Sequence, residues 1–167
     1  LTHCFRPFPN ALVDPKGKTR QSVMQARERG VLFDVGHGMG ALSFDVARKM
    51  LADGFRPDTI SSDAHVLSVN GPAYDVLTTL SKFLCMGMPL LDTLRTATST
   101  PAQVLRQPDL GALRPGAHAD LAILQLEEGE FSYRDVHGQE MLGNQRLTLD
   151  QVILKGKPWP GADASRS

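Results

Sequence analysis

Cysteine is scarce in this sequence, and its distribution excludes two classes of site. The two cysteines, Cys4 and Cys85, lie far apart and form no Cys-x-x-Cys pattern. This spacing argues against a disulfide scaffold and against a structural zinc site held by thiolates. Free thiols fit a reducing compartment, so we expect a cytoplasmic protein.

Neither an excess of charge nor a long hydrophobic run is present. Lys and Arg number 18, Asp and Glu number 18, and the formal net charge is zero. Without a basic surface to attract phosphates, nucleic acid is not an expected partner. The apolar runs are far shorter than the roughly 18–20 residues that cross a bilayer, and the first residues do not resemble a signal peptide. We therefore expect no membrane insertion either.

What the sequence does contain is enough apolar surface to build a core. It has 167 residues, of which 41% are hydrophobic, a size and composition typical of one globular domain or somewhat more. The chain begins at Leu1 rather than Met, within an apolar-polar alternation. We interpret this start as a cut end and expect the chain to be the C-terminal part of a longer protein.

The first part of the sequence alternates helical and strand patterns. The periodicity predicts a helix over Thr19–Arg29 that stops at Gly30, and a second helix from Phe44 to Leu51 with Ser43 as its N-cap. Buried strands are expected over Val31–Val35 and Asp58–Ser62. Such repeated units predict parallel α/β winding.

The second part changes character near residue 110. Helices are expected over Tyr74–Met86, from Pro89, and from Pro101. After them, Gly and Pro residues separate short β runs at Ala119–Gln125 and Gln151–Leu154, with a loop-rich stretch at Glu127–Asn144 between them. We therefore predict a first domain over residues 1–106, a small β domain over 107–160, and a disordered tail over 161–167.

A glycine-rich turn follows the strand at Val31–Val35 and permits two interpretations. Gly36, Gly38 and Gly40 match G-x-G-x-x-[GA] and resemble the first motif of methyltransferases that use S-adenosylmethionine. In that case Asp58 or Asp63 would hold the ribose. However, His37 places an imidazole at the centre of the turn, where a nucleotide binder gains nothing from it. We therefore prefer a second interpretation, in which the turn belongs to a metal site.

Three motifs each place an imidazole or a carboxylate where a strand gives way to a loop: Thr2-His3-Cys4-Phe5, Asp34-Val35-Gly36-His37-Gly38 and Ser61-Ser62-Asp63-Ala64-His65. His3, His37 and Asp63 are spaced by 34 and 26 residues, close to the roughly 31 residues per unit of a barrel of about 250 residues. Imidazole and carboxylate converging from consecutive strands suit zinc or a similar divalent ion. Because neighbouring strand residues face opposite sides, Cys4 is expected in the core.

These motifs resemble those of the amidohydrolase superfamily, and within it the deacetylase-like subgroup close to dihydroorotases. The segment Ala97-Thr98-Ser99-Thr100-Pro101-Ala102 and the later run from Gly111 to Ala122 resemble that family's return from its barrel to a small β domain. The resemblance extends to about Trp159. It implies an α/β fold: the C-terminal part of a (β/α)8 TIM barrel plus part of a small β-sandwich-like domain.

The resemblance also implies roles for individual residues. His3 would be the sixth-strand histidine that binds the more exposed metal ion. Asp63 would be the eighth-strand aspartate, a metal ligand and also the catalytic group that takes the proton from the attacking hydroxide. His37, Gly36, Gly38 and His65 would contact or position the substrate. The expected cofactor is zinc or another divalent ion, one or two per intact enzyme.

The family's remaining ligands do not occur in the sequence. These are the His-x-His pair of the first strand, the bridging carboxylated lysine or glutamate, and the fifth-strand histidine. We expect these ligands before Leu1. Without that part of the barrel, we expect the chain alone to be inactive. The predicted function is hydrolysis of an amide, or an ester, of a small molecule by a metal-bound hydroxide, most simply deacetylation. The alternatives are a dihydroorotase-type cyclic amidohydrolase, an inactive barrel scaffold and a methyltransferase. A homo-oligomer is compatible with the sequence.

Overall fold

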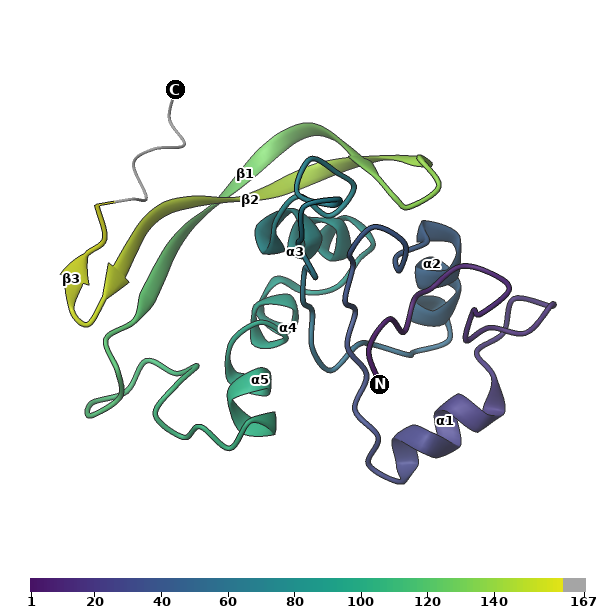
Figure 1. Cartoon of the computed structure of the whole chain (residues 1–167), viewed down its shortest axis with the longest axis horizontal. Helices are drawn as coiled ribbons and strands as arrows, with labels where there is room; N and C mark the ends of the chain where they lie inside the picture. The colour runs from purple at the N-terminus through teal and green to yellow at the C-terminus, as the bar shows by residue number, and fades with distance from the viewer. Residues whose placement is uncertain (161–167) are drawn as a thin grey trace.

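A computed structural model describes residues 1–160 of the chain. Helices and irregular segments make up its first part, and a long β-hairpin lies across them (Figure 1). The helices are α1 (Gln21–Glu28), α2 (Phe44–Ala52), α3 (Val76–Cys85), α4 (Leu90–Arg95) and α5 (Ser99–Val104), and the strands are β1 (Leu121–Arg134), β2 (Glu140–Leu154) and β3 (Lys157–Pro158).

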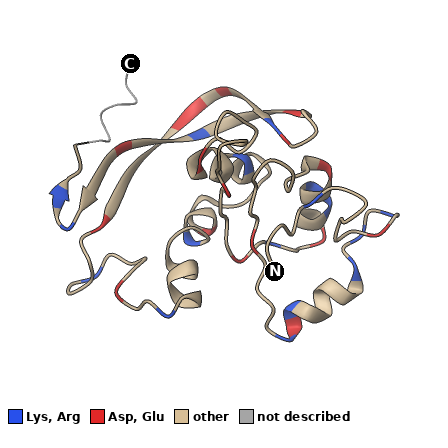
Figure 2. Ribbon diagram, viewed as in Figure 1, with Lys and Arg blue, Asp and Glu red and all other residues tan. Residues whose placement is uncertain are grey.

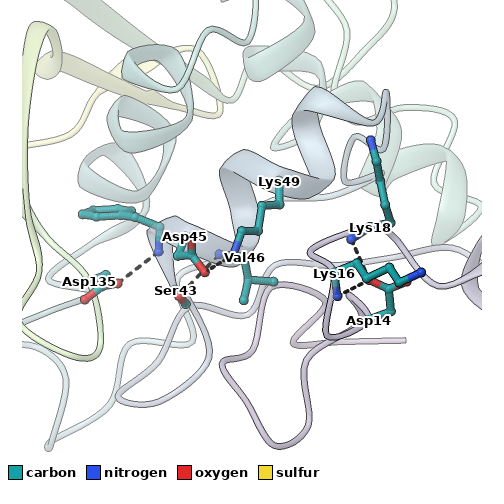
Figure 3. A network of polar contacts seen from close by, with 9 residues as sticks. Asp14, Lys16, Lys18, Ser43, Asp45, Val46, Lys49 and Asp135 are labelled. Atoms are coloured by element: carbon teal, nitrogen blue, oxygen red, sulfur yellow. Dashed lines mark hydrogen bonds and ion pairs between the residues drawn. The ribbon is translucent and has the colours of Figure 1, made fainter.

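Helix α2 confirms the expected cap at Ser43. The hydroxyl of Ser43 accepts a hydrogen bond from the backbone N–H of Val46 at 3.5 Å. A second cap comes from the hairpin, because a carboxylate oxygen of Asp135 accepts from the backbone N–H of Phe44 at 3.0 Å (Figure 3). Two N–H groups that the helix itself cannot satisfy are therefore paired. The first turn of α2 is fixed directly behind the glycine-rich turn.

The three expected strands appear as extended segments joined by a few hydrogen bonds and isolated bridges rather than as strands of a continuous sheet. The backbone N–H of Asp34 donates to Leu1 O at 2.9 Å, and that of Cys4 donates to Asp34 O at 3.1 Å. On the other side, Val35 donates to Thr59 O at 3.1 Å. The segment that begins at Val31 therefore lies between the other two, and its bridge from Asp34 to Thr59 is parallel. The α/β class is confirmed, whereas closure into a barrel stays a prediction.

The hairpin differs from the sequence-based expectation. Strands β1 and β2 pair antiparallel from Leu121–Ile153 to Arg134–Glu140, so the prediction of a loop-rich stretch over Glu127–Asn144 is wrong. An irregularity in the register between Glu128 and Phe131 accommodates Gly129 within β1. The turn is confined to the residues between Arg134 and Glu140, and β3 then pairs with the end of β2.

The hydrophobic core lies between the extended segments, α2 and α3. Phe5 contacts both Phe55 and Phe83, with ring centroids 6.1 and 5.4 Å apart. Cys4 is fully buried beside them, as the strand alternation predicted. Burial raises the pKa of its thiol strongly, so it is unreactive. The hairpin closes this core over α3, where Leu147 is buried.

The surface carries both signs of charge. Figure 2 shows Lys and Arg interspersed with Asp and Glu along the ribbon. Over residues 1–160, no helix is both long and apolar enough to cross a membrane. The predicted domain boundary near Arg106 stays a prediction, and the predicted disordered tail lies outside the described residues.

Candidate functional site

The ends of the three extended segments meet at the glycine-rich turn. Nδ1 of His3, from the first segment, lies 2.7 Å from the carbonyl oxygen of Gly36 in the second. A β-carbon added to Gly38 would lie 2.6 Å from Oδ2 of Asp63, from the third. The backbone N–H of Gly38 also donates to Ser62 O at 2.8 Å. The predicted site residues His3, Gly36, Gly38 and Asp63 are therefore neighbours.

His3 has the hydrogen bonding of a metal-binding histidine. Since the carbonyl oxygen of Gly36 can only accept, Nδ1 must carry the proton and Nε2 must carry the lone pair, a tautomer assigned from this hydrogen bond. Within residues 1–160, Nε2 has no hydrogen-bond partner. Histidines that bind metals commonly fix the other ring nitrogen on a backbone carbonyl in this way. The half-buried ring is thus able to donate its lone pair to an ion.

Asp63 is exposed, and its carboxylate oxygens have no hydrogen-bond partner in the described part of the chain. Its backbone is anchored instead, because the hydroxyl of the buried Ser68 lies 3.3 Å from its carbonyl oxygen. Both His3 (φ 67°) and Asp63 (φ 46°) adopt left-handed backbone conformations. For residues other than glycine this costs of order 1–3 kcal/mol each and is concentrated at functional sites.

The two glycines of the turn leave no room for a side chain. Gly36 (φ 50°) and Gly38 (φ 48°) are buried and left-handed. A β-carbon on Gly36 would lie 2.5 Å from Cγ2 of Thr2 and 2.7 Å from Nδ1 of His3. Glycine is therefore required at both positions, because the turn must bend and must approach His3 and Asp63 closely.

The ring of His37 points into the molecule. It is fully buried, Nδ1 lies 3.0 Å from Gly38 O, and Nε2 lies 2.7 Å from Nζ of Lys82. Burial, assisted by the nearby Lys82 charge, lowers the pKa of His37 to about 4, so the ring is neutral at pH 7. A substrate contact through this ring would require Lys82 to move. The predicted substrate-binding role of His37 stays a prediction.

Lys82 is a site neighbour that the sequence analysis missed. It lies on α3, is fully buried, and burial lowers its pKa to about 7. A signal was present, because Lys82 lies at helical spacing from Thr79 and beside Leu80 and Phe83, on the buried face of this helix. A lysine in that position is buried only when its ammonium group has partners inside the protein.

His65 lies on the loop that follows Asp63. It is exposed, its Nδ1 accepts from the backbone N–H of Leu67 at 3.3 Å, and its own N–H is 3.0 Å from the hydroxyl of Ser68. In the described residues its ring makes no hydrogen bond to Asp63. The predicted substrate contact of His65 stays a prediction, and the backbone of Asp63 is held by Ser68.

Asp34 is a second residue that the sequence analysis did not place. Its carboxylate accepts from the hydroxyls of Thr59 and Ser61, each at 2.7 Å, and from that of Thr2 at 3.3 Å. Those hydroxyls come from the first and third segments. Asp34 therefore ties all three segments together close to the turn and helps to fix the distance between His3 and Asp63.

The donor set fits part of a metal site. His3 offers a neutral imidazole nitrogen and Asp63 an anionic oxygen, both suitable for zinc. No cluster of three or more potential ligands (His, Cys, Asp or Glu) occurs in residues 1–160. Catalytic zinc sites use three protein ligands or more. These two residues therefore match a site that needs further ligands.

Comparison with known proteins identifies the family. The sequence model of the amidohydrolase family matches residues 42–158. The chain belongs to the amidohydrolase family. It is 31% identical over 159 residues to a deacetylase from Enterococcus faecalis and 32% identical over 148 residues to a deacetylase from Agrobacterium fabrum. The methyltransferase interpretation of the glycine-rich turn is therefore set aside.

Solved structures agree with this assignment. A crystal structure of an adenine deaminase superimposes with a TM-score of 0.92 at 30% identity, and one of a dihydroorotase with a TM-score of 0.83 at 28% identity. Each match covers 95% of this chain, but only 44% and 42% of the other chains. The matched regions likewise cover 43% and 34% of the two deacetylases. The chain thus corresponds to less than half of each of these relatives.

Proposed function

We propose that this chain forms part of a metal-dependent hydrolase that cleaves an amide, or an ester, of a small molecule. The observation that supports it most is the pairing of His3 Nδ1 with Gly36 O at 2.7 Å, which leaves Nε2 able to bind an ion, while the carboxylate of Asp63 lies against Gly38 of the same turn. Membership of the amidohydrolase family supports the same chemistry.

His3 and Asp63 would hold a divalent ion, with zinc preferred for an imidazole and carboxylate pair. When bound, such an ion would lower the pKa of a coordinated water molecule to about 7 and would act as a Lewis acid that polarises the scissile carbonyl. The remaining ligands would come from sequence outside these 167 residues, because the chain corresponds to less than half of its relatives.

Asp63 would move the proton. Its carboxylate is exposed and free of internal hydrogen bonds, so an oxygen can accept the proton of the attacking water and return it to the leaving nitrogen. Gly36 and Gly38 would let the backbone of the turn approach the substrate. His37 would stabilise the turn from the protein interior through its contact with Gly38 O. His65 would contribute to substrate binding from the next loop.

Deacetylation is the subtype that we favour, because two relatives at 31% and 32% identity are named deacetylases. A dihydroorotase-type opening of a cyclic amide is the second candidate, because of the structural likeness to a dihydroorotase at 28% identity. Both reactions attack a carbonyl carbon bonded to nitrogen, so the same residues serve either.

The test is metal content together with turnover in the full-length protein. We expect one or two divalent ions per chain by elemental analysis, loss of hydrolysis after chelation, and recovery with zinc. A panel of N-acetylated amino acids beside dihydroorotate separates the two subtypes. A protein that binds no divalent ion after zinc addition, or that hydrolyses neither class at any metal loading, would be the inactive scaffold instead.

A further inference from the structure

We propose that Lys82 is a positioning residue for the metal site, acting through His37 on the turn from Gly36 to Gly38. The inference rests on the proposed function, since it assigns Lys82 a part in holding His3 and Asp63.

Lys82 joins three separate segments of the chain. Its Nζ lies 2.7 Å from Nε2 of His37, 2.6 Å from Pro72 O and 2.8 Å from Arg134 O. Pro72 belongs to the loop that follows Asp63, and Arg134 ends β1. An ammonium group has three N–H donors, and these contacts provide three acceptors. The geometry therefore satisfies the lysine completely without any further partner.

Burial of the Lys82 ammonium group is energetically unfavourable. The side chain is fully buried, and within residues 1–160 it makes no ion pair with a carboxylate. Asp75 and Asp135 act on it only from a distance, and they raise its pKa less than burial lowers it. An apolar side chain of similar length would fill the same space at lower cost. Its presence indicates that the hydrogen bonds themselves are needed.

The first of these bonds fixes the ring of His37. Since Lys82 donates to Nε2, the proton of the neutral ring must be on Nδ1, which then donates to the carbonyl oxygen of Gly38. A ring free to rotate or to change tautomer would not hold this carbonyl. Lys82 therefore selects both the orientation and the tautomer of His37.

The turn that His37 occupies contacts both candidate ligands. Gly36 O receives the Nδ1 proton of His3, and Gly38 packs against the Asp63 carboxylate. A rotation of the peptide planes around His37 would move both contacts together. The chain of contacts runs from Lys82 through His37 to the imidazole that we propose as a ligand. Loss of such support around a ligand typically costs 10-fold to 100-fold in metal affinity, by order of magnitude.

The competing explanation is that Lys82 only fastens α3 to the hairpin. Ser81 provides the matched control, because it is also buried on α3 and also binds the hairpin. Its hydroxyl accepts from Leu147 N at 2.9 Å and donates to Leu77 O at 2.7 Å. In the described part of the chain it makes no hydrogen bond to the glycine-rich turn. Ser81→Ala therefore weakens the attachment of the hairpin without disturbing His37.

The first arm of the experiment needs no metal. Ring ¹⁵N chemical shifts of His3 and His37 are measured in metal-free, full-length protein for wild type, Lys82→Met and Ser81→Ala. We expect Lys82→Met to shift both histidines, and Ser81→Ala to leave both as in wild type. If His3 keeps its wild-type chemical shifts in Lys82→Met, Lys82 does not influence the environment of the His3 ring. The proposal is then overturned, whether or not the protein binds zinc.

The second arm measures zinc affinity by competition with a chelator, in single and double variants. Lys82→Met should weaken binding by about 10-fold, whereas the same substitution in a His37→Phe background should change it by less than about 2-fold. Equal losses in both backgrounds would show that Lys82 does not act through His37. An equal loss in Ser81→Ala would assign Lys82 to fold stability alone.

The two hypotheses fail in different ways. Wild-type protein that binds no zinc removes the proposed function, while the ¹⁵N measurement still decides the contact between Lys82 and His3. If Lys82→Met does not fold, His37→Phe takes its place: it should shift the ring signals of His3 and weaken zinc binding by about 10-fold, because it removes the acceptor and leaves the lysine. Wild-type His3 shifts and zinc affinity in His37→Phe would then overturn the proposal.

Discussion

Nδ1 of His3 and the carbonyl oxygen of Gly36 lie 2.7 Å apart, although the two residues are separated by more than thirty positions in the chain. The hydrogen bond fixes which nitrogen of the imidazole can bind an ion. It also makes the glycine-rich turn part of the ligand's support. Asp63 and His37 lie against the same turn, so the geometry of this pair depends on them.

His3→Ala should lower metal occupancy in the full-length protein. The variant removes a neutral imidazole nitrogen, and we expect zinc affinity to fall by at least about 10-fold. Elemental analysis after dialysis against a fixed zinc concentration measures it. His118→Ala is the control, because His118 is exposed in a different loop. Full occupancy in His3→Ala would remove His3 from the metal site.

Asp63→Asn should abolish turnover. The amide cannot accept the proton of the attacking water and cannot bind the ion as an anion, so kcat should fall by at least about 10²-fold. Asp109→Asn is the control, because that exposed carboxylate pairs with Arg114 at 3.1 Å. Wild-type kcat in Asp63→Asn would exclude this residue from the mechanism.

Gly36→Ala and Gly38→Ala should reduce activity more than stability. The added β-carbon would collide with His3 or Asp63, and a left-handed alanine costs roughly 1–2 kcal/mol. We expect kcat/KM to fall by about 10-fold or more, since the collision displaces the candidate ligands. Gly40→Ala is a close control, because a β-carbon there has no atom within 4 Å and the backbone is not left-handed. Unchanged kinetics in both variants would contradict this prediction.

The free energy of unfolding should decrease when the pH is lowered from 6.5 to about 4. In this range His37 is neutral in the folded protein but protonated in the unfolded chain. Its pKa is about 4 when folded, against 6.5 for an unperturbed histidine. Between these values the unfolded chain binds more protons, so the free energy of unfolding decreases as the pH falls. Full stabilisation is present above pH 6.5, and up to about 3 kcal/mol is lost near pH 4. Urea denaturation of wild type and His37→Phe measures the difference, and parallel pH curves for the two would disprove it.

Residues 1–167 expressed alone should show no metal-dependent hydrolysis, even with added zinc. Within residues 1–160 two candidate ligands lie at the site, and the extended segments leave hydrogen-bonding edges and apolar residues such as Leu32 and Leu1 exposed. Light scattering and an activity assay test this expectation. A soluble, zinc-dependent hydrolase made of this chain alone would show that the site is complete without other sequence.

Local signals predicted the helices well. The Ser43 cap and the 3.6-residue periodicity placed α2 within one residue of its observed end at Ala52, because both signals act within a few residues. The approach of His3 and Asp63 to the same glycine-rich turn follows from the expectation that parallel strands bring their carboxyl ends to one edge, whereas their joint role as ligands stays a prediction. That argument needed only the order and spacing of the motifs.

Contacts between distant residues could not be predicted in the same way. Gly129 and Gly143 suggested a loop in the hairpin, but Gly143 lies where any β-carbon would collide with Cys85 on α3. Gly143 therefore allows β2 to approach α3 closely and does not interrupt the strand. The pairing of Lys82 with His37 spans 45 positions, and no local pattern identifies the partner of a buried lysine.

The two ends of the β-hairpin differ in how much they depend on the rest of the molecule. At one end, the buried Asp135 holds the N–H of Phe44 and those of His137 and Gln139, and Val136 N–H donates to Leu42 O. At the other, the turn at Lys155 is exposed, and its backbone hydrogen bonds within residues 1–160 go to Asp120 and Ala119 at the start of the same hairpin. A reporter peptide or affinity tag inserted after Lys155 would leave the site undisturbed. One inserted between Asp135 and Gln139 would disturb the hydrogen bond from Asp135 to Phe44 and, with it, the first turn of α2.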